Sequence, residues 1–418
     1  MTAKMEPQTL KGFRDFLPEE KRRRDFLLKK IIETFKIFGF EPLETPTLEY
    51  ASLLLGKYGD EADKLLYRFK DKGDREVALR FDQTVPTARI LSQYRNTLPK
   101  FFRRYQIQNV FRAEKPQSGR FREFTQCDID IFGTTSPIAD AEIVVTTYSA
   151  FKNIGYPTVN LLINDRQTLF NCLKPFSTSS VDDFSIIQSL DKLEKFGKEK
   201  VIEELIKKGL GEKTVEEIIN QIQKVKQSDN LRKIIDYSIQ LGVSPQDIKF
   251  SPTLARGLDY YTGMIFEVVV PEYSKTSSCG GGGRYDKLIN QLGGTDIPAV
   301  GIAFGFDRMV EAAQQLKIIP QNKTETNVLI TLFSQETIKQ SLKISQQLRK
   351  NGISTEVFPA EEKLDKQLKY SDRKGIPYVI IIGPEEAKKE VVKLKNMKTG
   401  EQKTFSIDKV IKFLISKS

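Results

Sequence analysis

The spacing of apolar residues along the chain predicts alternating helices and strands, beginning with a long helix between residues 19 and 38. Its apolar positions recur at helical intervals at Phe26, Leu27, Ile31, Ile32, Phe35 and Phe38. Gly39 then ends the helical pattern, and the proline-broken stretch "FEPLETPTLEY" predicts an extended chain. The run "EVALRF" at residues 76–81 predicts a strand, and "DQTVPTARILSQY" predicts a turn that enters a helix.

A hairpin is predicted between residues 101 and 133, where the polar loop "KPQSG" separates the runs "FFRRYQIQNVFRAE" and "FREFTQCDIDIFG". Because alternate residues of a strand share a face, one face carries the side chains of Arg122, Phe124, Gln126, Asp128 and Asp130. Such a face suits the floor of a wet pocket on an antiparallel sheet. The alternative is a sheet surface that simply faces solvent.

The rest of the chain divides by its pattern. A helix, "DAEIVVTTYSAFKNIG", and a strand, "TVNLLIN", precede a lysine- and glutamate-rich helical stretch at about 165–247, which predicts an inserted helical subdomain. Strands resume at 263, "GGGGRYDKLINQLGG" predicts a glycine-rich turn and then a helix, and "AVGIAFGFDRMVEAAQQL" predicts a buried strand that enters a helix. From about residue 325, strands alternate with helices, which predicts an α/β domain of about ninety residues with a parallel sheet.

Composition narrows the class of protein. No apolar run is long enough to span a membrane, and the N-terminus lacks the apolar core of a secretory signal. Three widely spaced cysteines favour a reducing cytoplasm over a disulfide framework. Without histidine or a Cys-x-x-Cys pair, we expect no protein-bound structural zinc, and no residue is assigned as a metal ligand. The net charge of +11 suits a polyanionic partner such as RNA, although solvated lysine-rich surfaces give the same charge.

Two stretches suggest a site for a small polar or phosphorylated molecule. "LARGLDYYTGMIFE", residues 254–267, gathers Arg256, Tyr260 and Tyr261 before a strand, where a plain surface turn is the alternative. Arg308, in "GFDR", follows a buried strand at the start of a helix, where a guanidinium can bind phosphate with two hydrogen bonds. The segment "GGGGR" lacks the Lys-Ser/Thr of a Walker motif, and close strand packing at a bend explains its glycines equally well.

Several motifs, in order, resemble one family over essentially the whole chain. "GFEPLETPTLEY", "FRAEKPQSGRFREFTQCDIDIFG" and "AVGIAFGFDR" resemble motifs 1, 2 and 3 of class II aminoacyl-tRNA synthetases, and "LARGLDYYTGMIFE" resembles a loop peculiar to histidyl-tRNA synthetases. The early stretch "KGFRDFLP" and the segment "LRFDQTVP" also resemble that family. The resemblance implies an α+β fold with a six- or seven-stranded antiparallel sheet. It also implies a catalytic domain at 1–320, with the helical insertion at about 165–247, and an anticodon-binding-like α/β domain at 325–418.

The family's site residues carry over by motif. The resemblance implies catalytic roles for Arg112, Arg256 and Arg308. It implies a histidine site at Asp82, Thr84, Arg112, Gln126, Asp130, Arg256, Tyr260 and Tyr261. It implies an ATP site at Arg112, Glu114, Arg120, Phe124 and Arg308. Lys115 and Gln117 become candidates for contacting tRNA, with a solvated loop as the alternative.

The implied reaction joins histidine to tRNA-His. ATP activates histidine to histidyl-adenylate with release of pyrophosphate, and the histidyl group then passes to the 3′-terminal adenosine. ATP brings Mg²⁺, and Pro46 of motif 1 implies a homodimer. The main alternative is a non-catalytic regulatory paralogue, although such relatives tend to lose the histidine-specific loop or the C-terminal domain, and this chain keeps both.

The absence of histidine from all 418 residues has two explanations. Compositional drift is the simpler, because tryptophan is absent as well. Alternatively, a histidine-free sequence lets an enzyme of this family be made when charged histidyl-tRNA is scarce. In that case its synthesis during histidine starvation should fall less steeply than that of histidine-containing proteins of similar size. An equally steep fall, measured by pulse labelling, leaves drift as the explanation.

Overall fold

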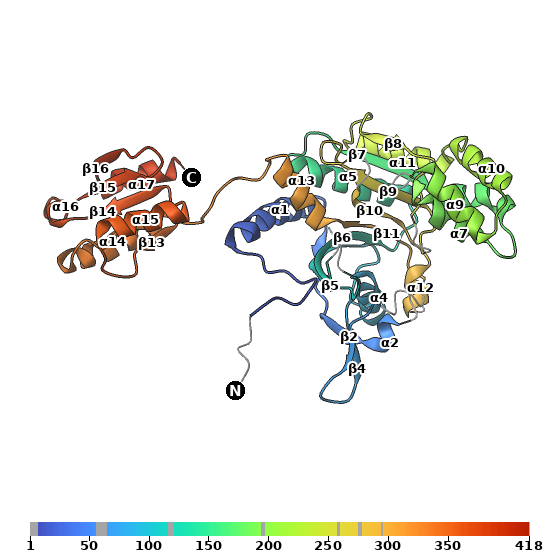
Figure 1. The fold of residues 1–418 in the computed structure, drawn as a ribbon, viewed down its shortest axis with the longest axis horizontal. Coiled ribbons are helices and arrows are strands. Elements are labelled where there is room, and N and C mark those ends of the chain that lie inside the picture. The colour runs from blue at the N-terminus through green and yellow to red at the C-terminus, as the bar shows by residue number, and fades with distance from the viewer. Residues whose placement is uncertain are drawn as a thin grey trace. The chain divides into compact units, whose positions relative to one another are not determined.

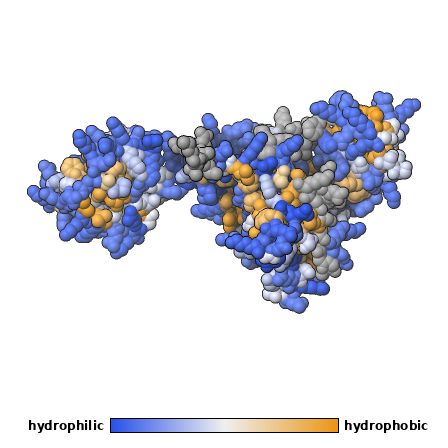
Figure 2. Space-filling model, turned by 60° about the horizontal axis from the view of Figure 1, so that its bottom comes forward, coloured by the Kyte–Doolittle hydropathy of each residue, from blue (hydrophilic) through white to orange (hydrophobic). Residues whose placement is uncertain are grey.

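The computed structural model describes residues 7–55, 65–115, 121–193, 197–256, 260–274, 278–293 and 296–417. The chain forms two compact units (Figure 1). One consists of Arg24–Ile319 with the chain up to Asp15, and the other of Pro320–Ser418 with Phe16–Arg23. Among the described residues, none of the helices combines the length and the hydrophobicity that a membrane crossing requires. Polar side chains cover most of the face shown in Figure 2, with apolar side chains in patches between them.

An eight-stranded sheet forms the centre of the larger unit. Its strands, in spatial order, are β1 (Glu41–Pro42), β5 (Phe102–Phe111), β6 (Glu123–Phe132), β11 (Ala299–Phe304), β10 (Ser278–Arg284), β9 (Met264–Val269), β7 (Asn160–Asp165) and β8 (Ile248–Phe250). The six central strands pair antiparallel, as the α+β fold class predicts. The expected number of six or seven strands is too low, because the short strands β1 and β8 add parallel edges.

A separate, three-stranded antiparallel sheet is formed by β2 (Leu48–Tyr50), β4 (Glu76–Leu79) and β3 (Arg68–Lys70), in that spatial order. The larger unit contains α1 (Pro18–Ile37) from Arg24 onward, together with α2 (Ala51–Leu54), α4 (Thr84–Gln93), α5 (Pro137–Ile154), α6 (Arg166–Leu173), η1 (Lys174–Phe176), α7 (Asp183–Leu190), α9 (Lys198–Lys208), α10 (Glu212–Gln223), α11 (Asp229–Gln240), α12 (Leu288–Gly293) and α13 (Phe306–Gln315). The long N-terminal helix and the hairpin β5–β6 match the sequence predictions closely.

The two faces of the large sheet differ in chemistry. α1, α5, α11 and α13 pack against one face and form the main core with the alternate β6 residues Cys127, Ile129 and Ile131. Gln126 and Asp130 therefore project to the opposite face, as strand alternation requires. In Figure 1, α5, α11 and α13 lie above the strands β6 and β11, and α4 and α12 lie below these strands. The lower face carries the site described below.

The helical stretch predicted at 165–247 divides between two cores. α6, α7, α9 and α10 join α4 and α12 in an apolar cluster on the polar side of the sheet. α11, in contrast, packs against α5 in the main core through Leu231 and Ile234. Its apolar stripe has the same period as those of its neighbours, so only packing assigns it to the main core.

The glycine-rich segment is the clearest error of the sequence predictions. Residues 278–284 form the buried strand β10 rather than a turn. Consecutive glycines give no alternation of polar and apolar side chains, so the pattern of the sequence does not indicate a strand there. Here its absence of a side chain is needed, since a Cβ on Gly282 would stand 2.0 Å from the carbonyl oxygen of Gly301 on the next strand.

The smaller unit contains a five-stranded sheet in the order β13 (Thr355–Val357), β12 (Val328–Ile330), β14 (Tyr378–Ile381), β15 (Val391–Asn396) and β16 (Gln402–Ser406). Its helices are η2 (Gln335–Thr337), α14 (Ile338–Lys350), α15 (Leu364–Lys374), α16 (Pro384–Lys388) and α17 (Ile407–Ile415). The prediction of a parallel sheet is correct for β13, β12 and β14 and wrong for β15 and β16, which pair antiparallel. The periodicity of apolar residues identifies a strand but does not tell whether the chain returns to it antiparallel or crosses over to run parallel.

Candidate active site

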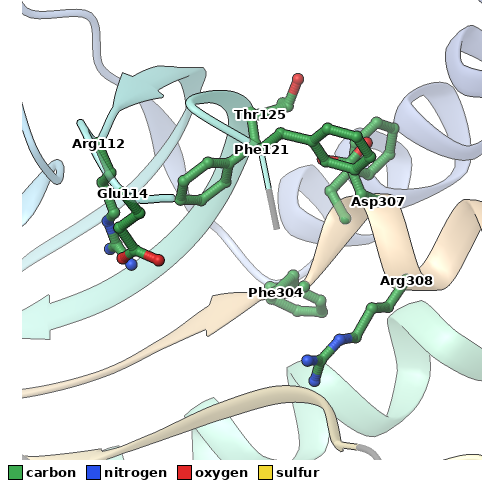
Figure 3. Close-up of a pocket in the computed structure, with 10 residues that line it drawn as sticks. Arg112, Glu114, Phe121, Thr125, Phe304, Asp307 and Arg308 are labelled. Carbon is green, nitrogen blue, oxygen red and sulfur yellow. The ribbon is translucent and has the colours of Figure 1, made fainter. Parts of the chain in front are cut away.

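Two of the three stretches that resemble class II motifs meet around a pocket of about 310 Å³ in the larger unit (Figure 3). Arg112 and Glu114 follow the end of β5, and Arg308 enters from the opposite side at the start of α13. The remaining lining residues are Phe121, Phe124, Thr125, Phe304, Gly305, Phe306 and Asp307. Aromatic walls with a cation on each side suit a planar ring joined to an anionic chain.

Arg112 is fixed by aromatic and backbone contacts. Its guanidinium carbon lies 4.4 Å from the ring centroid of Phe81 and 5.0 Å from that of Phe124. Its Nε donates to the carbonyl oxygen of Phe81 at 3.3 Å. On the other side, Arg308 Nη1 donates to the carbonyl oxygen of Ser278 at 2.9 Å, and the side chain is otherwise exposed.

Asp307, which lines the pocket, forms ion pairs with two arginines to which the sequence motifs gave no role. Asp307 Oδ1 pairs with Arg14 at 3.0 Å and with Arg24 at 2.5 Å. Arg14 also stacks on Phe121, with 3.3 Å between the guanidinium carbon and the ring centroid, and Arg24 donates to Thr125. The N-terminal segment thus joins the hairpin to the start of α13. Arg14 lies in "KGFRDFLP", a stretch whose resemblance to the family was the available signal.

A chain of polar and aromatic contacts runs along the same face of the sheet. Asp130 pairs with the fully buried Arg104 at 2.7 Å and accepts a hydrogen bond from Tyr285. The Tyr285 ring lies edge-on to Tyr260 at 5.9 Å, and the Tyr260 and Tyr261 centroids are 4.6 Å apart. The two predicted tyrosines are therefore linked to Asp130 through a third tyrosine.

Arg256 continues this chain on the far side of Tyr261, whose ring centroid is 5.6 Å from the guanidinium carbon. Its Nη1 pairs with Glu267 of β9 at 3.0 Å, and Arg166 donates to its carbonyl oxygen. Burial alone would lower the pKa of Arg256, but Tyr261 and Glu267 more than offset it, so the side chain stays charged.

Glycines make room for these side chains on the sheet floor. A Cβ on Gly301 would stand 1.8 Å from Asp130 Oδ1, and one on Gly281 would stand 1.9 Å from Arg256 Nη1. Both positions sit directly beside the polar residues in the strand register, since Gly301 pairs with Asp130 and Gly281 with Glu267. The close-packing explanation of "GGGGR" is therefore correct for β10, and the packing includes a site arginine.

Burial disfavours negative charge on this face. It raises the pKa of Asp128 to about 8, against the opposing effect of Arg104 and with a further contribution from Asp130 and Asp82. Burial likewise raises the pKa of Asp130, while Arg104 and Tyr285 oppose it. A bound cation would relieve this cost, which suits a ligand with an ammonium group.

The predicted residues fall into two adjoining sets. Four of the five nucleotide-site candidates line the pocket: Arg112, Glu114, Phe124 and Arg308. The histidine-site candidates Asp82, Gln126, Asp130, Tyr260, Tyr261 and Arg256 lie on the sheet face and its rim, with Thr84 at the first residue of α4. Lys115 is exposed. Gln117 and Arg120 lie outside the described residues.

Sequence reasoning missed the partners of these residues. Arg104 and Tyr285 lie outside the family motifs and Glu267 is the last residue of one, "LARGLDYYTGMIFE"; none of the three was assigned a role, yet each contacts a predicted site residue. For Glu267 the available signal was a charged residue in the otherwise apolar strand β9, whereas Arg104 lies among several polar residues of β5 and gave no such signal.

Known proteins are similar to this chain in sequence and in fold. The family model described as histidyl-tRNA synthetase matches residues 12–309, and the one described as anticodon binding domain matches residues 315–417. A histidine–tRNA ligase of Wolinella succinogenes is 39% identical over an alignment of 425 positions, gaps included, that covers 95% of this chain and 95% of its own. The crystal structure of histidyl-tRNA synthetase from Nostoc sp. PCC 7120 has a TM-score of 0.86 at 30% identity and covers 99% of this chain and 100% of its own.

A Bacillus halodurans structure described as an ATP phosphoribosyltransferase regulatory subunit/histidyl-tRNA synthetase has a TM-score of 0.72 and covers 87% of this chain. At 21% identity this likeness shows the shared fold alone. Two matches show the family as well as the fold: the one to the ligase of W. succinogenes over nearly the full length, and the one of residues 12–309 to the family model. The chain belongs to the histidyl-tRNA synthetase family.

Proposed function

We propose that this chain is a histidine–tRNA ligase that activates histidine with ATP and then transfers it to the 3′-terminal adenosine of tRNA-His. The observation that carries this function is the meeting of Arg112, Glu114, Phe124 and Arg308 around one pocket, beside a buried face with acids and tyrosines. In the first step, the histidine carboxylate attacks the α-phosphorus of ATP and pyrophosphate leaves. In the second, the tRNA hydroxyl attacks the acyl carbon and AMP leaves.

The nucleotide pocket supports an assignment for each part of ATP. Phe124 stacks on adenine, Glu114 orients it, and Arg112 contacts the α-phosphate. Arg308 binds the γ-phosphate, and its position across the pocket from Arg112 supports this division (Figure 3). Arg120 is a further ATP contact. These cations stabilise the charge that develops on the phosphates, without any need for a protein histidine.

We propose that Mg²⁺ arrives bound to ATP. Hard cations of this kind take phosphate oxygens and one or two carboxylates as ligands. The described part of the chain contains no group of three or more cysteine, aspartate or glutamate side chains arranged to hold a metal ion. ATP oxygens would therefore supply most of its ligands.

Histidine specificity rests on the polar face. The α-ammonium meets Asp82, Thr84 and Gln126, and the imidazole lies between Asp130 and the pair Tyr260 and Tyr261. A site that bonds both imidazole nitrogens rejects isosteres that lack them, because its own buried groups would be left unpaired. Arg112 also contacts the carboxylate region of histidine, and Arg256 lies beside the α-phosphate.

Contacts with tRNA are assigned to three parts of the chain. Lys115 and Gln117 meet the acceptor end, the inserted helices lean on the acceptor stem, and the smaller unit binds the anticodon. From Glu325 onward the chain holds 18 Lys and Arg against 12 Asp and Glu, a net charge of +6 that suits phosphate contacts. We assign the catalytic domain to 1–320 and the anticodon-binding domain to 325–418, and the division of the two units at Ile319 and Pro320 supports this.

A homodimer in the cytoplasm completes the proposal. Pro46 belongs to motif 1, and the small sheet that follows it exposes Leu48, Tyr50 and Phe69 by 44%, 59% and 47%. Apolar side chains that are this exposed and lie together on one small sheet are suited to burial against a second copy of the chain. Sedimentation of the purified chain gives its mass directly.

The decisive experiment is ATP–pyrophosphate exchange with each of the twenty amino acids in turn. We expect exchange with histidine alone, because only its side chain pairs with both Asp130 and the tyrosines. If folded protein shows no exchange with any amino acid, the chain is better explained as a non-catalytic regulatory paralogue.

A further inference from the structure

We propose that Asp128 is a positioning residue that holds the side-chain amide of Gln126 with its oxygen toward the substrate's α-ammonium group. The inference rests on the proposed function, in which Gln126 contacts that ammonium. It adds a residue to which the family resemblance gave no role. Gln83 completes the arrangement from the other side.

The side chain of Gln126 is bound at one end only. Its Nε2 donates to Asp128 Oδ2 at 2.7 Å, and both residues lie on the polar face of β6. Its Oε1 is buried and has no hydrogen-bond partner among the described residues. A buried acceptor without a partner is costly, so its orientation suits a donor supplied by a ligand.

The backbone of Gln126 is held as well. Gln83, which is fully buried, donates from Nε2 to the carbonyl oxygen of Gln126 at 2.9 Å and to that of Gln108 at 3.0 Å. Gln83 adjoins Asp82, one of the proposed ammonium ligands. Backbone and side chain of Gln126 are thus fixed by two different residues, which limits the directions in which Oε1 can point.

The direction of the amide decides whether it attracts the substrate. An ammonium only donates hydrogen bonds, so it is attracted by Oε1 and repelled by the NH₂ end. Without an acceptor at position 128, the Gln126 amide can turn over at little cost. An acceptor there is needed to keep NH₂ away from the pocket.

Asp128 acts through this hydrogen bond rather than through charge. Burial raises its pKa to about 8, with Arg104 opposing and Asp130 and Asp82 adding to the effect, so its carboxyl is largely neutral at pH 7. A neutral carboxyl still accepts from Gln126 through its carbonyl oxygen. Asparagine at this position keeps a similar acceptor, and alanine removes it.

Three ligands separate this role from a general structural one. Histidine and histidinol carry the α-ammonium, and 3-(imidazol-4-yl)propanoate lacks it. In histidine-dependent ATP–pyrophosphate exchange with Asp128→Ala, we expect the KM for histidine and the inhibition constant of histidinol to rise roughly tenfold. The inhibition constant of the propanoate and the KM for ATP should change by less than about threefold. Asp128→Asn should retain most of the wild-type preference for ammonium-bearing ligands.

Two outcomes would overturn the proposal. Equal weakening of all three ligands by Asp128→Ala would make Asp128 structural, and equal losses in Asp128→Asn and Asp128→Ala would make its charge the active feature. In a Gln126→Ala background, Asp128→Ala should add little, because the two act in series. The failure of the proposed function is separate: it appears as absent exchange in the wild type, before any variant is compared.

Discussion

Replacing Arg256 with alanine is expected to lower the rate of histidine-dependent ATP–pyrophosphate exchange roughly a thousandfold. Its guanidinium is the cation proposed beside the α-phosphate, where charge develops as the phosphorus is attacked. The side chain is mostly buried between Tyr261 and Glu267, so water replaces it poorly. The measurement is kcat/KM for histidine, with the thermal midpoint recorded in parallel.

Stability must be separated from catalysis, because Arg256 pairs with Glu267 at 3.0 Å. Removing one partner leaves a mostly buried carboxylate without its cation, at a cost of about 3 kcal/mol. The double variant Arg256→Ala/Glu267→Gln removes that unpaired charge, so its thermal midpoint should recover while its exchange rate stays low. Recovery of both together would mean that Arg256 only supports the fold.

Alanine at Gly281 is expected to lower kcat for exchange by about a hundredfold or more, with a thermal midpoint close to that of the wild type. The new Cβ would stand 1.9 Å from Arg256 Nη1, and its three nearest neighbours are all guanidinium atoms. The end of a long side chain can move aside cheaply. Displacement of this cation by about an ångström is enough to cost catalysis.

Gly282 provides the matched control on the other face of the same strand. A Cβ there would meet the carbonyl oxygen of Gly301 at 2.0 Å and the Cα of Ile302 at 2.6 Å. Neighbouring backbone cannot yield as a side chain does, so Gly282→Ala should cost about 1–3 kcal/mol in the free energy of unfolding. Comparable destabilisation by both substitutions would show that the site face has no more freedom than the core face.

Local pattern predicted the elements whose side chains repeat with a clear period. The helix α1 and the hairpin β5–β6 match their predicted ranges to within a few residues, because each buries one regular stripe or face. β10 failed for the opposite reason, since four glycines carry no periodic signal. The edge strands β1 and β8, of two and three residues, are too short for any period to show.

The amino-acid sequence by itself determined the family, the order of the motifs and the residue types of the proposed site, because these depend on identity and spacing along the chain. Tertiary structure alone decided which residues support them. Arg104 reaches Asp130 across the β5–β6 hairpin, Tyr285 reaches it from just beyond β10, 155 positions along the chain, and Glu267 reaches Arg256 when the segment before β9 folds back on that strand. The same is true of Gly301, where a Cβ would meet Asp130 of the neighbouring strand, and of Gly281, where a Cβ would meet Arg256 from the segment before β9. Local periodicity carries no information on such pairings, since they arise from the closure of a sheet over more than a hundred residues of chain.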